Sequence, residues 1–362
     1  MQLFECQGCR SALHFENSQC LTCGRPVGFL QDRFWMSALE GGPWRFEALG
    51  AERQPYRFCD NARHGVCNWL IPDGAADILC EACRHNRMIP DLSIPRNVER
   101  WRGIELAKRY VIRALLRWRL PHPNKADDPE RGLAFDFLAE PASGYPSGAP
   151  VMTGHDNGLI TVNIAEGDDA EREKRRTALG EPYRTLVGHF RHEIGHYYWD
   201  RLVRDGGKLE AFRHEFGDER ADYQASLQRY YAQGPQADWG NRFISAYACA
   251  HPWEDFAETW AHYLHIVEAL ETARSYGIDV RARFIPDPEA AKIDFNPYNA
   301  PSAERLVEAW TPLTVALNAI NRSMGQHDLY PFVLNEPVLR KLEFVRALIH
   351  DARDVRLGSR AA

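Results

Sequence analysis

The segment His192-Glu193-Ile194-Gly195-His196 lies in a stretch whose apolar residues recur at helical spacing. On an α-helix, His192 and His196 lie one turn apart on one face, so both imidazoles can point at one metal ion. Glu193 lies beside the first histidine and can reach a water in the open position of that ion. Two nitrogen ligands, an open position and a carboxylate that takes a proton from water are the arrangement of a zinc hydrolase.

The residues around this motif predict a helix over about residues 183–203. Its apolar face consists of Leu186, Val187, Phe190, Ile194 and Trp199. Gly195, between the two histidines, leaves room for another backbone or a ligand. The alternative is an amphipathic helix with two ordinary histidines, so a third metal ligand is the feature to look for.

The best third ligand lies in Tyr247-Ala-Cys-Ala-His-Pro-Trp-Glu254-Asp-Phe-Ala-Glu258. Pro252 suits the first turn of a helix, and the acidic residues after it complement the positive end of that helix. Glu254 and Glu258 then lie one turn apart on one face. We expect Glu254 to bind zinc and Glu258 to accept a hydrogen bond from the second N–H of a ligand histidine.

These two segments carry a resemblance. The helix around residues 192–196 resembles the active-site helix of gluzincin metallopeptidases. The string Tyr-Ala-x-x-x-Pro-x-Glu-x-Phe-Ala is similar to the second motif of the lethal-factor-like and Mlc-titration-factor-like members. The resemblance implies that Glu254 is the third zinc ligand and that Tyr247, seven residues earlier, stabilises the oxyanion.

A wider resemblance covers nearly the whole chain. Residues 151–164, 184–199 and 251–265 resemble a bacterial family of putative zinc-binding metallopeptidases that is preceded by a zinc-ribbon domain. The expected fold class is therefore α+β: a mostly helical gluzincin-like domain with a small sheet, behind a small β and loop module.

A second acidic segment competes for the third-ligand role. Phe216-Gly-Asp218-Glu219-Arg-Ala-Asp222-Tyr follows the first helix more closely and opens a predicted helix over residues 220–232. We prefer Glu254, because it brings a tyrosine and a second carboxylate with it. Glu219 is then a hydrogen-bond partner of the histidines. Capping and surface charge are the alternative for Asp218, Glu219 and Asp222.

Two further histidines lie close to the motifs in sequence. His189 falls one turn before His192 and could line the cleft or form an ordinary hydrogen bond within the helix. His251 could bind substrate, assist Tyr247, or belong to the start of the second helix.

Eight of the nine cysteines fall in the first 83 residues. The first set is a pair of knuckles, which is a strong zinc-ribbon signal: Cys6-x-x-Cys9 and Cys20-x-x-Cys23. The second set is spaced less regularly: Cys59, Cys67, Cys80 and Cys83. Each set predicts a closed structural zinc site that supplies folding energy to a segment with a small core. Together with the histidine site, the chain is expected to bind one catalytic and two structural zinc ions.

Other arrangements of the cysteines remain open. His64 or His85 could replace a cysteine in the second site, and Cys6 and Cys9 could join Cys80 and Cys83. Disulfides are the other alternative, but the sequence shows no secretory signal, and paired knuckles favour metal in a reducing compartment.

Length and composition suit two domains. The 362 residues, of which 44% are hydrophobic and 26% charged, are typical of a globular protein larger than one small core. Pro90 and Pro95 mark a boundary, so we expect a ribbon module at 1–92 and a metallopeptidase domain at 93–362. A net charge of −6 argues against general nucleic-acid binding, and no apolar run is long enough to cross a bilayer.

The clearest predicted strand covers residues 158–164, with a glycine before β-branched residues. Peptidases of this class often bind an extended substrate along an edge strand, which would place Gly158, Ile160 and Val162 against the peptide backbone. An ordinary core strand is the alternative. Further helices are predicted over 97–118, 253–276, 303–322 and 336–353.

The sequence thus predicts a cytoplasmic zinc-dependent peptidase in which Glu193 activates a zinc-bound water for attack on a peptide bond. Its substrate is a peptide or a protein, and the ribbon could also contact a protein partner. One alternative is a non-catalytic or regulatory zinc-binding protein that docks partners through its ribbon. A zinc hydrolase acting on a non-peptide amide is the other.

Overall fold

The computed structural model describes residues 2–140, 151, 153–179, 185–278, 280–281 and 291–358. The chain divides into two compact units, one of residues 1–117 and 122–175 and one of residues 118–121 and 176–362. The first unit contains the strands and the two N-terminal cysteine sets, whereas the second is helical. This arrangement confirms the predicted α+β class.

Five strands of the first unit close into a small barrel in the order β3–β4–β5–β6–β7. They are β3 (Val27–Leu30), β4 (Trp35–Gly41), β5 (Phe46–Ala48), β6 (Gln54–Phe58) and β7 (Trp69–Pro72). Neighbours are antiparallel, except that β3 and β7 pair in parallel and close the barrel. One cluster in its core contains Leu30, Leu39, Ala48, Ala51, Tyr56 and Leu70.

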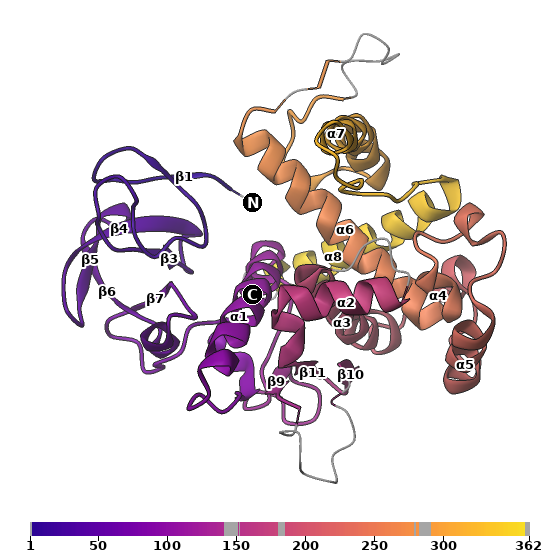
Figure 1. Ribbon diagram of the computed structural model, residues 1–362, viewed down its shortest axis with the longest axis horizontal. Coiled ribbons are helices and arrows are strands. Elements are labelled where there is room, and N and C mark those ends of the chain that lie inside the picture. The colour runs from indigo at the N-terminus through magenta and orange to yellow at the C-terminus, as the bar shows by residue number, and fades with distance from the viewer. Residues whose placement is uncertain are drawn as a thin grey trace. The chain divides into compact units, whose positions relative to one another are not determined.

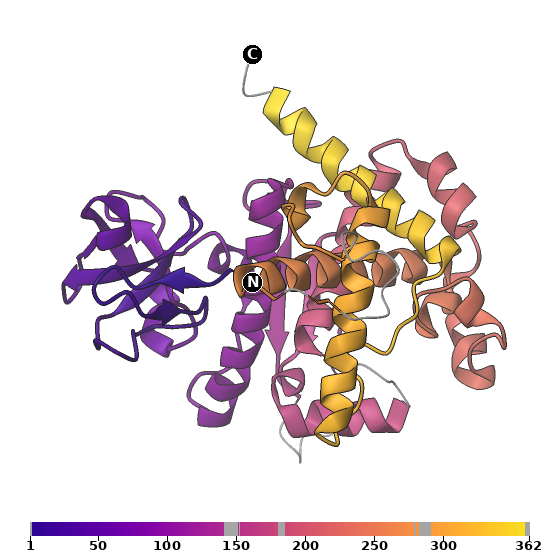
Figure 2. The same cartoon turned by 90° about the horizontal axis from the view of Figure 1, so that it is seen from above.

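The helix α1 (Pro95–Trp118) lies between this barrel and a second sheet of the same unit in both views of the molecule (Figures 1 and 2). The sheet has the order β10–β11–β9–β8. Its strands are β8 (Asn86–Met88), β9 (Ala134–Leu138), β10 (Gly154–Asp156) and β11 (Leu159–Asn163). Arg109 of α1 donates to Asn68 next to β7, and Lys108 donates to Asn86 of β8. Polar contacts therefore join α1 to both β elements.

The strand predicted over residues 158–164 is observed as β11, but it is not an edge strand. It pairs in parallel with β9 on one side and antiparallel with β10 on the other. The prediction of an edge strand is wrong, because residues 154–156 fold back as a hairpin and occupy that edge. The substrate contacts expected of Gly158, Ile160 and Val162 remain a prediction.

The helices after the sheet are α2 (Asp169–Leu179), α3 (Leu186–Tyr198), α4 (Leu209–Phe216), α5 (Tyr223–Gln233), α6 (Pro252–Ser275), α7 (Ala303–Ser323) and α8 (Glu336–Gly358). The helices α3 and α6 pack together at the centre of the second unit, where the rings of Tyr198 and Trp260 stack with centroids 4.8 Å apart. None of the helices in the described part of the chain combines the length and apolar character that a bilayer span requires.

A short two-stranded sheet precedes the barrel. It consists of β1 (Phe4–Glu5) and β2 (Ala12–Leu13), which pair antiparallel. The first knuckle, with Cys6 and Cys9, lies between these two strands, and the second follows β2. The sheet therefore fixes the loop that carries the first pair of thiols.

Candidate metal centres

The two histidines of the first motif lie on α3. Thr185 begins this helix, because its Oγ1 accepts a hydrogen bond from the backbone N–H of Gly188 at 3.0 Å. The helix was predicted from residue 183, but residues 183 and 184 lie outside the described residues, and a π-helical turn over Trp199–Arg204 follows. His192 and His196 face the same side, and their Nε2 atoms are 3.1 Å apart.

The start of α6 brings Glu254 to these histidines. His251 caps this helix, since its Nδ1 accepts from the backbone N–H of Trp253 at 3.1 Å, and a proline follows at the first helical position. This is the helix-start role among the three considered for His251. Glu254 Oε2 then lies 3.0 Å from His192 Nε2 and 3.5 Å from His196 Nε2.

These separations fit one zinc ion. Ligand atoms that bind zinc tetrahedrally at about 2.0–2.1 Å stand about 3.3 Å from one another. The three observed separations lie between 3.0 and 3.5 Å. Two imidazole nitrogens and a carboxylate oxygen are also the donor set of a catalytic zinc site, which leaves a fourth position open. The residues of this cluster therefore suit zinc in both geometry and chemistry.

Glu258 lies one turn after Glu254 and contacts the outer side of the first histidine. Its Oε1 is 2.7 Å from His192 Nδ1, and its Oε2 accepts a hydrogen bond from the hydroxyl of Ser245 at 2.6 Å. With Nδ1–H donated to Glu258, the Nε2 lone pair of His192 points at the shared position. The structure thus places Glu258 where the sequence predicted it, and its effect on zinc affinity remains to be measured.

The carboxylates of Glu254 and Glu258 favour a positive charge on or beside the ring of His192. Burial lowers the pKa of His192, but Glu254 and Glu258 raise it well above its usual range in the metal-free chain. Burial also raises the pKa of Glu258, but the hydrogen bond from His192 and the charge of that ring bring it down to about 2. The buried carboxylate of Glu254 and the half-buried one of Glu258 are thus stabilised by a cation, which can be a proton on the imidazole or a metal ion.

Zinc affinity at this cluster should fall as the pH falls. His192 must lose a proton before its Nε2 can bind a metal, and its pKa is raised in the metal-free chain. Below that pKa, each lower pH unit weakens binding about tenfold. Zinc affinity is measured by competition with a chelator between about pH 6 and about pH 8. The Glu254→Ala variant gives the zinc that is bound by the cysteine sites alone, which is subtracted. A pH-independent affinity over this range would contradict the prediction.

Glu193 is buried on α3 beside the ligand pair. His189 Nε2 lies 3.3 Å from Glu193 Oε1, which is the hydrogen-bonding role among those considered for His189. Burial raises the pKa of Glu193, but His189, His192 and His196 lower it overall. Glu193 is therefore ionised at neutral pH and can accept a proton.

Glu219 does not join this cluster. Its Oε2 accepts a hydrogen bond from Arg213 Nε at 2.9 Å, and it is absent from the described groups whose ligand atoms converge. Glu219 was expected to form a hydrogen bond with one of the histidines. It pairs with the guanidinium of Arg213 instead. Asp222 caps α5 by accepting from the N–H of Ala225 at 3.0 Å, which is the capping alternative.

Aromatic side chains surround the cluster. The ring of Tyr247 lies 5.9 Å from that of His192, and the ring of Trp253 lies 3.8 Å from that of His196 at a tilt of 38°, with both distances measured between centroids. Tyr223 of α5 donates a hydrogen bond to Glu254 Oε1 at 2.6 Å. Neither Trp253 nor Tyr223 could be singled out from the sequence, because no spacing rule links an aromatic residue to a ligand on another helix.

Gly195 is the point where α3 meets α6. A Cβ added to Gly195 would lie 2.9 Å from the Cα of Ala257 and 3.2 Å from its carbonyl oxygen. Such distances cannot be relieved without moving one helix backbone. The space that the sequence predicted next to this glycine is therefore filled by another backbone.

Gly195→Ala should separate the two helices that carry the ligands. We expect a loss of about 1–3 kcal/mol in the free energy of unfolding, together with weaker zinc binding at the histidine cluster. Thermal unfolding and chelator competition measure the two effects. Gly240→Ala is the matched control, because a Cβ there would meet nothing within 4 Å. Equal stability and equal zinc affinity of the two variants would contradict the close approach of α3 and α6 at Gly195.

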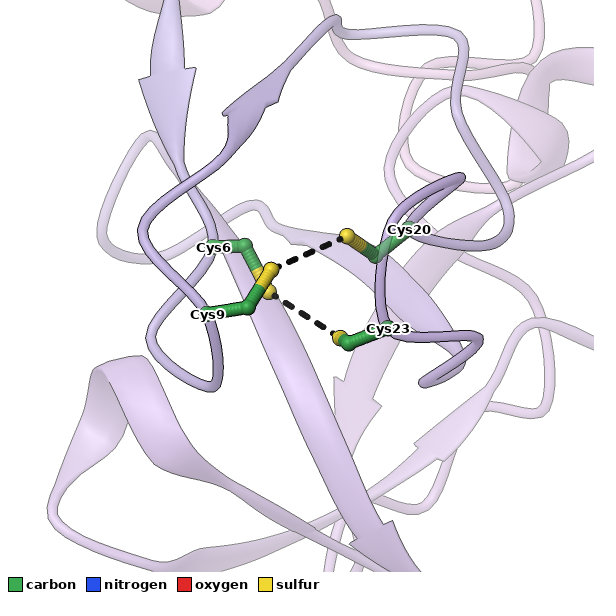
Figure 3. Close-up of side chains that lie close together, drawn as sticks. All are labelled: Cys6, Cys9, Cys20 and Cys23. Carbon is green, nitrogen blue, oxygen red and sulfur yellow. Dashed lines mark hydrogen bonds between the residues drawn. The ribbon is translucent and has the colours of Figure 1, made fainter.

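The first cysteine set forms a compact group of thiols. Cys6, Cys9, Cys20 and Cys23 point toward one another from two loops (Figure 3). The Sγ atoms of Cys6 and Cys23 are 3.8 Å apart, and those of Cys9 and Cys20 are 3.6 Å apart. Four thiolates at about 2.3 Å from zinc would stand about 3.8 Å from one another, whereas a disulfide requires about 2.05 Å. The spacing fits a metal site and excludes disulfides between these pairs.

The second set forms its own group deeper in the protein. Its members are all buried: Cys59, Cys67, Cys80 and Cys83. The Sγ atoms of Cys67 and Cys80 are 3.7 Å apart, again the spacing of zinc ligands. His85 lies outside the group and bonds the carbonyl oxygen of Leu133 through Nδ1, while His64 accepts from its neighbour Arg63. The structure therefore keeps the two sets separate and uses no histidine in the second.

Comparisons with known proteins agree with this geometry. The family described as "Putative zinc-binding metallo-peptidase" matches residues 97–348, and a zinc-ribbon domain matches residues 3–94. Uncharacterized proteins of Mycobacterium tuberculosis and Mycobacterium bovis are each 40% identical to this chain over 353 residues, which is 97% of this chain and 96% of theirs. No solved structure matches.

Proposed function

Since this chain belongs to the family of putative zinc-binding metallo-peptidases, with a zinc-ribbon domain before the peptidase region, we propose that it is a zinc-dependent peptidase of the gluzincin type. The observation that carries the proposal is the convergence of His192, His196 and Glu254 within 4.8 Å of one another. Zinc at this cluster would act as a Lewis acid that lowers the pKa of a water and polarises the scissile carbonyl.

The residues around the cluster have separate tasks in this proposal. Glu193 accepts a proton from the attacking water and later gives it to the leaving amine. Burial and the charge of Glu254 raise the pKa of Tyr247, so its hydroxyl keeps its proton and can donate to the oxygen of the tetrahedral adduct. Glu258 holds the ring of His192 in place. The substrate is a peptide or a protein.

The cysteine sites have a structural role in the proposal. Two zinc ions would hold the ribbon module at 1–92, and the third would serve the metallopeptidase domain at 93–362. Because four thiolates leave no open position, the ribbon metals take no part in hydrolysis. We place the protein in the cytoplasm, where thiols stay reduced and available as ligands.

Cleavage of a peptide library tests the proposal directly. The zinc-loaded full chain is incubated with the library, and new termini are identified by mass spectrometry. We expect cleavage that a chelator stops and that added zinc restores. Absence of cleavage with zinc bound to His192 and His196 would contradict a peptidase and favour a regulatory zinc-binding protein. Hydrolysis of non-peptide amides alone would indicate the other alternative.

A further inference from the structure

We infer that Tyr223 is a positioning residue that makes Glu254 a single-oxygen ligand of the catalytic zinc. The inference rests on the proposed metal site and adds a residue from a different helix to it. The two carboxylate oxygens of Glu254 have different partners: Oε2 faces His192 and His196, whereas Oε1 accepts a hydrogen bond from the hydroxyl of Tyr223 at 2.6 Å.

Catalysis depends on the two oxygens of Glu254 having different partners. A carboxylate can approach zinc through one oxygen or through both, and a second oxygen would take up space that a catalytic site keeps open. The phenol of Tyr223 engages Oε1, so Oε2 remains for the metal. A single-oxygen Glu254 leaves the position that water and substrate need.

The ring of Tyr223 is held by neighbours that also border the ligands. It meets His251 edge-on, with centroids 5.2 Å apart, and Trp253 edge-on at 5.6 Å. The ring of Trp253 in turn contacts that of His196 at a tilted angle. Tyr223 is thus packed against two of the three residues that directly precede Glu254, and these contacts restrict the rotation of its ring.

His251 fixes the distance between the two helices at this point. Its Nδ1 accepts from the backbone N–H of Trp253 on α6, and its Nε2 donates to the carbonyl oxygen of Ala221 at 3.1 Å. Ala221 precedes Tyr223 by two residues, and Trp253 precedes Glu254 by one. The imidazole of His251 therefore helps to hold the hydroxyl of Tyr223 next to the carboxylate of Glu254.

Tyr223 lies on the partly buried side of α5. All of α5 is described, and Ser226 is its one buried residue. Leu227 and Tyr230 are half-buried on the same side as Tyr223, and the ring of Tyr230 meets that of Tyr247 edge-on with centroids 5.6 Å apart. The hydroxyl of Tyr223 adds its contact with Glu254 to this packing, so a variant that keeps the ring isolates that contact.

Tyr223→Phe tests the inference, because it keeps the ring and removes the hydroxyl. Loss of a residue that supports a metal ligand typically lowers metal affinity about 10–100-fold, and we expect a loss of that size here. Affinity is measured by chelator competition on the full chain. The metal content of Glu254→Ala serves as the background for the two cysteine sites.

Tyr298→Phe is the matched control. It also removes a buried hydrogen bond from a tyrosine to a glutamate, from Tyr298 to Glu268 Oε1 at 2.8 Å, but does not touch a proposed ligand. We expect it to keep wild-type zinc affinity. At saturating zinc, Tyr223→Phe should regain most of its peptide cleavage, because its defect lies in holding the metal.

Two results would overturn the inference. One is a zinc affinity of Tyr223→Phe within about twofold of wild type. The other is an equal loss in Tyr298→Phe, which would indicate general destabilisation of the unit. If His192, His196 and Glu254 do not bind zinc at all, the result is different. Glu254→Ala would then have the same metal content as wild type.

Discussion

Glu193→Gln should lower the rate constant for peptide cleavage by about 10²–10⁴-fold while the zinc content stays unchanged. Glutamine has the shape of glutamate but cannot accept the proton of the attacking water. Glu193 is not among the converging ligand atoms, so its amide should not release the metal. Steady-state kinetics on one cleaved peptide, together with metal analysis of the same sample, measure both quantities.

An exposed glutamate in the same unit provides the control for this experiment. Glu210→Gln, in the first turn of α4, makes the same chemical change outside the cluster and should leave the rate unaltered. Wild-type turnover by a Glu193→Gln protein that still contains its zinc would refute a role for this carboxylate as the base.

Glu254→Ala should reduce the metal content from three zinc ions per chain to two. An oxygen of Glu254 is one of the three candidate ligand atoms of the histidine cluster. The two cysteine groups consist of other residues and do not include Glu254. Two imidazoles alone bind zinc far more weakly than a three-ligand site. Cleavage activity should disappear with the ion. Elemental analysis after dialysis against buffer with trace zinc gives the count.

Glu219→Ala decides between the two acidic segments that the sequence offers. Glu219 pairs with Arg213, so its removal should leave three ions bound and most of the activity intact. A chain that keeps three ions without Glu254 and loses one without Glu219 would reverse the assignment of the third ligand.

The parts of the site that follow local rules could be predicted from the sequence. The one-turn spacing of His192 and His196 places both rings on one face of any helix. Pro252 followed by acidic residues indicates a helix start, and the structure begins α6 at that residue. Glu258 then falls one turn after Glu254, in reach of the first histidine.

Contacts between distant segments could not be predicted in the same way. Tyr223 reaches Glu254 across 31 residues because two helices meet, and no local pattern encodes that meeting. The hairpin that covers β11 depends on the short segment 154–156, which carries no alternation of apolar residues. Barrel closure likewise depends on the pairing of β3 with β7, which lie some 40 residues apart in the sequence.

Because its ligands come from both α3 and α6, a zinc ion at the proposed site would cross-link remote parts of the chain. A ligand that binds only the folded state stabilises it by mass action, by about 2.7 kcal/mol when its free concentration is a hundred times Kd. Since His196 and Glu254 belong to different helices, that gain is lost once those helices part. The folded fraction of the helical unit, and with it the resistance of the protein to proteolysis, thus follows the supply of free zinc in its surroundings.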